Sequence, residues 1–133
     1  MNKVIRMCLI HDLGEAFTGD IPTFQKSEND AEIEDIFLED WVNSFSKGQR
    51  DEWTDLLSEM NKLETPEAKT YKALDKLEAV ISHNESDIGT WLPLEYDLQL
   101  TYGMENVQFS EYLRALKADI DKWTREKINT EKP

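Results

Sequence analysis

The residues best suited to chemistry lie together in the segment His11 to Pro22, which reads HDLGEAFTGDIP. If this segment is helical, Glu15 lies four residues after His11 and three after Asp12, so the three side chains share one helix face. Asp20 follows a glycine, where a reversal of the chain would return a fourth polar side chain toward that face. Imidazole and carboxylate groups together are a donor set for a divalent metal ion, and they leave Mn²⁺, Co²⁺, Mg²⁺, Fe²⁺ and Zn²⁺ open.

Spacing alone also allows less chemical interpretations of the same residues. A His-Asp pair arises by chance, and a histidine beside apolar residues is more often a hydrogen-bonded core residue than a ligand. Asp75 is a second acid among apolar positions, but it could equally be a surface carboxylate paired with Lys72 or Lys76. His83 lies two turns after Asp75, about 12 Å along the helix axis, and is not expected to be a ligand.

The elements that must position these residues are predicted to be helices. Apolar residues recur with a period near 3.6 in successive segments, and no segment alternates with a period of two for the length of a strand. The first helix is expected at residues 2–17, followed by a loop at 18–26. Its expected core face consists of Val4, Ile5, Cys8, Leu9 and Leu13.

The remaining helices are recognised by their ends. A second helix is expected behind Ser27 as N-cap, a third around residues 53–63, and a fourth that begins at Pro66. A shorter helix is expected at 94–102, and Ser110 is expected to cap the last one. The apolar stripe of the second helix recurs every four residues as Ile33, Phe37, Trp41 and Phe45. The sequence thus predicts an all-α bundle of five to six helices.

Composition limits the class of protein and of partner. The 133 residues, 39% of them hydrophobic, suit one folded domain over residues 1–133. The net charge of -13 repels a polyphosphate backbone, so we expect no nucleic acid polymer as partner, and a small phosphorylated ligand needs a bound cation. No apolar run approaches the roughly 18 residues of a membrane span. Cys8 is the one cysteine, which favours the cytoplasm and a buried thiol.

Several motifs together resemble the HD-domain phosphohydrolases, and within them the 5′-deoxynucleotidase branch. That branch has His-Asp, a Glu four residues after the His, Gly-Asp with a Pro soon after, and a Glu-Ala-Lys helix that leads to a Leu-Asp metal position. The resemblance covers about residues 3–82 clearly. The matching residues here are His11-Asp12, Glu15, Gly19-Asp20-Ile21-Pro22, Glu67-Ala68-Lys69 and Leu74-Asp75.

This resemblance implies His11, Asp12 and Asp75 as ligands of a divalent metal ion, with Glu15 and Asp20 acting on the reacting water and the leaving group. The implied substrate is a nucleoside 5′-monophosphate. The family's further His on a preceding helix, and its Arg-Trp pair, have no counterpart here, so we expect impaired activity. Core faces left open by those helices should be covered in a homodimer. The alternative is a non-catalytic acidic helical module, for dimerisation or regulation, that keeps the motif as a hydrogen-bond network.

Overall fold

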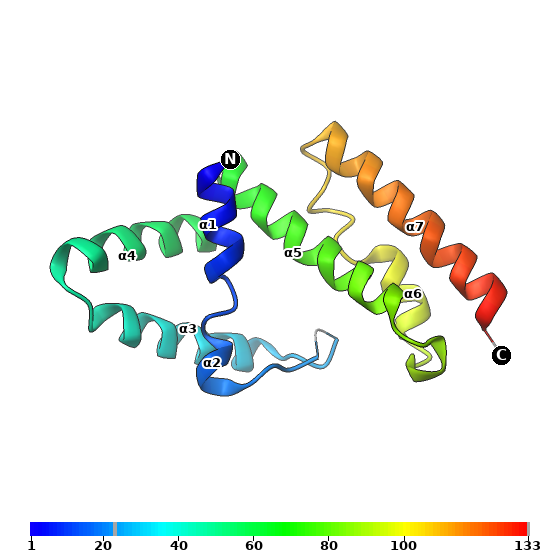
Figure 1. Ribbon diagram of the computed structural model, residues 1–133, viewed down its shortest axis with the longest axis horizontal. Coiled ribbons are helices and arrows are strands. Elements are labelled where there is room, and N and C mark those ends of the chain that lie inside the picture. The colour runs from blue at the N-terminus through cyan, green and yellow to red at the C-terminus, as the bar shows by residue number, and fades with distance from the viewer. Residues whose placement is uncertain (23, 133) are drawn as a thin grey trace. The chain divides into compact units, whose positions relative to one another are not determined.

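A computed structural model describes residues 1–22 and 24–132, and within these residues it contains helices and no strand (Figure 1). The all-α class is confirmed. The chain divides into two compact units, Met1–Tyr71 and Lys72–Pro133, and helix α5 (Pro66–Glu85) contributes to both. The single domain expected from composition stays a prediction. None of the described helices has the length and apolar character needed to cross a bilayer.

The first unit is built from paired helices. Ser27 caps α3 as expected: its hydroxyl accepts the backbone N–H of Asp30, whose carboxylate accepts the backbone N–H of Ser27 in return. Helices α3 and α4 form a hairpin, α2 packs on α3, and α1 packs on α4 (Figure 1). The bounds are α1 Asn2–Ile10, α2 Glu15–Thr18, α3 Glu28–Asn43 and α4 Lys47–Lys62.

The first predicted helix was wrong in length, because α1 ends at Ile10 and α2 begins only at Glu15. Between them the backbone bonds tighten, so that the Glu15 N–H bonds the carbonyl of Asp12, three residues back. Gly14 gives the physical reason. A Cβ at Gly14 would lie 3.0 Å from the carbonyl oxygen of Glu34 on α3, so any larger residue would require α3 to shift by a few tenths of an ångström.

The predicted core face of the first helix was also wrong. Ile5 and Leu9 are 50% and 75% exposed, and Cys8 is partly buried rather than enclosed. Since α1 carries apolar residues on most of its circumference, their period could not select the buried side. The buried side chains of α1 are Val4, Met7 and Ile10.

The second predicted stripe lies on the surface. Helix α3 buries Leu38 and Val42, whereas Ile33, Phe37 and Trp41 are exposed. Leu38 and Val42 form one row of residues four apart, and Ile33, Phe37 and Trp41 form another, offset by one residue and therefore turned by roughly 100° around the helix. The exposed aromatic residues are considered again below.

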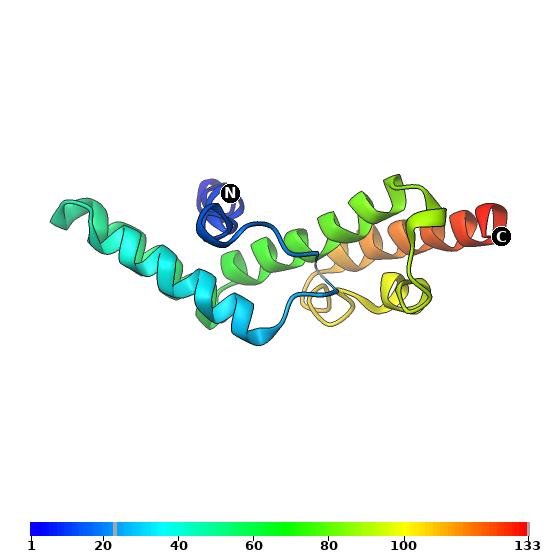
Figure 2. The ribbon, with the colours of Figure 1, turned by 90° about the horizontal axis from the view of Figure 1, so that it is seen from below.

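In the second unit, α5 and α7 run side by side in the same direction, and η1, α6 and the segment after α6 connect them (Figures 1 and 2). Ser110 caps α7 by accepting the backbone N–H of Leu113, as predicted. The bounds are η1 Ile88–Thr90, α6 Glu95–Thr101 and α7 Glu111–Glu131. The core residues of this unit are Ala73, Leu77, Val80, Val107, Leu113 and Ile120.

A buried polar network joins the helices of the second unit. Asn84 Nδ2 on α5 donates to Thr124 Oγ1 on α7 at 2.9 Å, and Thr124 also bonds the carbonyl oxygen of Ile120 at 3.0 Å. Gln99 Nε2 on α6 donates to the carbonyl oxygen of Val80 at 3.1 Å and to Asn84 Oδ1 at 3.2 Å. Because all three side chains are almost fully buried, these bonds fix the register of α5, α6 and α7.

Candidate metal centre

The imidazole of His11 is oriented by the end of α1. Its Nδ1 donates to the carbonyl oxygen of Cys8 at 2.5 Å. A carbonyl can only accept, so Nδ1 carries a proton, and Nε2 is the nitrogen left for a metal ion. Nε2 lies 3.1 Å from Oδ2 of Asp12, and the ring packs at a tilt against the Tyr71 ring with centroids 6.2 Å apart. A metal-binding histidine is held in this way, with one nitrogen bonded to a carbonyl and the other directed at the ion.

Glu15 lies within a group of negative charges. Burial raises the pKa of its carboxyl above the ordinary value, and the charges of Asp12 and Asp20 raise it further, while the Lys26 ammonium lowers it. Three predicted site residues, Asp12, Glu15 and Asp20, therefore lie close enough in the first unit for the charges of the two aspartates to act on Glu15. A carboxyl whose pKa is shifted toward neutrality is suited to accept a proton from water.

Lys26 is a neighbour of this group that the sequence reasoning missed. Its ammonium lies 2.7 Å from Glu34 Oε2 and 3.5 Å from Glu15 Oε1. Burial alone would lower the pKa of Lys26, but these two carboxylates outweigh it and raise the pKa above its ordinary value. One signal could have identified this residue, because no other lysine or arginine stands between Arg6 and Lys47 in the sequence.

Asp75 lies in the second unit, on α5. Its Oδ2 is 3.0 Å from Lys72 Nζ, so one of the two ion pairs allowed by spacing is formed. The other cation that spacing allowed as a partner, Lys76, places its ammonium over the Tyr102 ring, 4.3 Å from the ring centroid. Asp75 is partly buried and still offers a carboxylate oxygen as a ligand atom. Its role as a ligand stays a prediction.

His83, the second histidine, has contacts within its own unit. Its ring stacks on Trp91 with centroids 4.6 Å apart, and its Nε2 lies 3.2 Å from Glu95 Oε2. The same Glu95 oxygen accepts the backbone N–H of Leu92 at the start of α6. These contacts give His83 a structural role in joining α5 to α6.

Comparison with known proteins identifies the family. The 5′-deoxynucleotidase HDDC2 of Dictyostelium discoideum is 33% identical over 85 residues, which are 62% of this chain and 45% of that protein. The chain thus spans less than half the length of this relative. No solved structure gives a significant match. The model of the HD domain matches residues 1–117, which include His11, Asp12 and Asp75, and the chain therefore belongs to the HD domain family.

Proposed function

We propose that this chain is a metal-dependent phosphohydrolase whose substrates are nucleoside 5′-monophosphates. The observation that carries the proposal is His11, because its Nδ1 is bonded to a backbone carbonyl and its Nε2 is directed at the carboxylate of Asp12. Membership of the HD domain family and the name of the similar Dictyostelium protein support the reaction class.

The donor groups fit a divalent ion. His11 Nε2 and an oxygen of Asp12 would bind it together with an oxygen of Asp75, which lies one turn after Tyr71 on the continuous helix α5. This set contains nitrogen and oxygen donors without a thiolate, so Mn²⁺, Co²⁺, Mg²⁺, Fe²⁺ and Zn²⁺ all remain candidates. A bound ion supplies a Lewis acid for the phosphoryl group and makes water more acidic near it.

The chain's own carboxylates would move the protons. Glu15 would accept a proton from the attacking water as the water oxygen bonds to phosphorus. The raised pKa of the Glu15 carboxyl suits that role. Asp20 would give a proton to the 5′ oxygen as the phosphorus–oxygen bond to the nucleoside breaks. Lys26 would hold Glu15 in place through their 3.5 Å contact. The products are a nucleoside and inorganic phosphate.

The resemblance implies one more imidazole ligand than the chain presents, so we propose that the chain as given binds its metal loosely and reacts slowly. The expected homodimer and cytoplasmic location also stay predictions. Light scattering at increasing protein concentration tests the dimer, and a protein that is monomeric at high micromolar concentration contradicts it.

Metal binding is the first test of the site. By calorimetry with Mn²⁺ or Co²⁺, we expect His11→Ala and Asp75→Asn each to weaken binding at least tenfold, or by about 1.4 kcal/mol. His83→Ala is the matched control and should bind as the unchanged protein does. If His83→Ala abolishes binding and Asp75→Asn has no effect, the ligand assignment is wrong.

Phosphate release tests the activity. With added Mn²⁺ or Co²⁺ and deoxyribonucleoside 5′-monophosphates, we expect a rate at least a hundredfold higher when a family-like N-terminal segment with the further His precedes the chain. Glu15→Ala in that longer protein should remove the gain. Rapid turnover by the chain alone contradicts the incomplete ligand set, and restored metal binding without any turnover favours a non-catalytic module.

A further inference from the structure

One side of the first unit carries a row of aromatic rings in mutual contact, which we call the aromatic ladder. The Phe17 and Phe37 rings are stacked with centroids 5.8 Å apart. The Trp41 ring meets the Phe45 and Trp53 rings edge to face, with centroids 4.8 and 6.0 Å away. These contacts hold the rings in defined orientations. The ladder consists of Phe17, Phe37, Trp41, Phe45 and Trp53.

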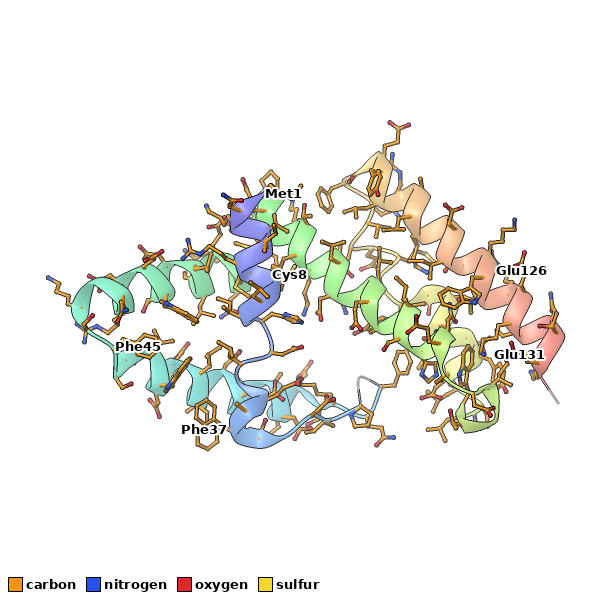
Figure 3. The ribbon with its side chains drawn as sticks, in the orientation of Figure 1. Met1, Cys8, Phe37, Phe45, Glu126 and Glu131 are labelled. Carbon is orange, nitrogen blue, oxygen red and sulfur yellow. The ribbon has the colours of Figure 1, made fainter. Side chains whose placement is uncertain are left out.

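Three of the five rings of the aromatic ladder face solvent, and the Phe45 and Trp53 rings are partly buried. Phe17, Phe37 and Trp41 are 47%, 45% and 38% exposed, and Figure 3 shows Phe37 projecting from α3. Core packing of α3 does not need these rings, because the helix buries Leu38 and Val42 instead. Large rings held in place and left in contact with water are typical of a surface that binds another molecule, since Phe and Trp are enriched at interfaces and Trp is frequent at their energetic centres.

The charge beside the aromatic ladder indicates which kind of molecule that is. Helix α3 contains seven carboxylates and no basic residue in the sequence ENDAEIEDIFLEDWVN. Asp40 is exposed beside Phe37 and Trp41, whereas Glu32 and Glu39 are exposed further round the helix. A second copy of this chain would bring a second set of seven carboxylates against the first, which like-charge repulsion disfavours. A cationic partner gains from the same field.

We propose that the aromatic ladder binds a cationic amphipathic helix of another protein. Apolar side chains of that helix, spaced three and four residues apart, would insert among Phe17, Phe37 and Trp41, and its Lys or Arg side chains would face the carboxylates of α3. None of the ladder residues is assigned to metal binding or proton transfer, and the nearest in sequence is Phe17, two residues after Glu15 on α2.

The test uses the whole chain and three synthetic peptides of equal length. One is an amphipathic Leu/Lys helix, one is the same composition in a scrambled order, and one is an amphipathic Leu/Glu helix. Binding is followed by calorimetry and by tryptophan fluorescence, since Trp41 and Trp53 belong to the ladder. We expect the amphipathic Leu/Lys peptide to bind at least tenfold more tightly than the other two and to weaken as salt is added.

Variants locate the binding. Phe37→Ser combined with Trp41→Ser should weaken binding of the Leu/Lys peptide at least tenfold, whereas Tyr112→Ser on α7, a residue 76% exposed, should leave it unchanged. Asp40→Lys should weaken it several-fold without removing any ring, and Glu126→Lys on α7 is its control. Circular dichroism checks that each variant is folded.

Three results would overturn the proposal. Equal binding of the ordered and scrambled Leu/Lys peptides would show diffuse attraction to an acidic protein, and equal binding of the Leu/Glu peptide would show that charge plays no part. A dimer in light scattering that Trp41→Ser converts to monomer would assign the aromatic ladder to a second copy of the chain.

Discussion

Replacing Gly14 by alanine tests the close approach of α2 to α3. Gly14 has φ -59° and ψ -32°, an ordinary right-handed conformation, so alanine would normally stabilise the fold by about 0.4–1 kcal/mol. Here the new Cβ would lie 3.0 Å from the Glu34 carbonyl oxygen and 3.1 Å from the Glu34 Cβ. Such overpacking against backbone costs roughly 1–3 kcal/mol. The two effects together predict a net loss of stability between roughly 0 and 2.5 kcal/mol, with about 1 kcal/mol in the middle.

Gly48→Ala is the matched control in the same unit. Gly48 lies in the first turn of α4, and a Cβ there would meet no atom within 4 Å. Alanine should therefore stabilise the fold by about 0.5–1 kcal/mol. Urea unfolding followed by circular dichroism measures both variants against the unchanged protein. If Gly14→Ala stabilises the fold as much as Gly48→Ala does, α2 does not lie against α3 as described and our reason for the interrupted helix is wrong.

Two further substitutions test the charged and polar interior. Burial and neighbouring carboxylates raise the pKa of Glu15, so ionising this carboxyl costs stability as pH rises through that pKa. Without metal, Glu15→Gln should therefore stabilise the fold at pH 7 and give no gain in stability at a pH well below the ordinary pKa of 4.5. A midpoint of thermal unfolding that is unaffected by Glu15→Gln at pH 7 contradicts this. Thr124→Val should destabilise the second unit by about 1–3 kcal/mol because the buried Nδ2 of Asn84 loses its acceptor. Thr130→Val at an exposed site should change stability by less than about 0.5 kcal/mol, and similar losses at both sites count against the network.

The ends of several helices could be predicted because the signals for them are local. Ser27 and Ser110 each accept a backbone N–H three residues ahead, and Pro66 begins α5. A cap depends on the residue itself and on those within one turn of it, all of which are adjacent in the sequence. The all-α class follows from such signals and from the apolar period without any knowledge of packing.

The buried faces could not be predicted, because they depend on partners that the local pattern does not show. On α1, apolar residues surround the helix, and the choice of Met7 over Leu9 is made by packing against α4. On α3, the regular stripe through Phe37 is the exposed side, contrary to the usual relation between an apolar period and a core. Lys26 was missed for the same reason, since its pairing with Glu34 joins residues from a loop and from a later helix.

The interruption after α1 is also what orients His11. In a continuous α-helix the carbonyl of Cys8 would accept the backbone N–H of Asp12, four residues ahead. Here the helix ends at Ile10, and the carbonyl of Cys8 accepts the imidazole Nδ1–H of His11. The bond keeps a proton on Nδ1 and leaves Nε2, the nitrogen nearer Asp12, as the one that would bind a metal ion. The close approach at Gly14, which ends the regular helix, therefore supports the ligand role that we propose for His11.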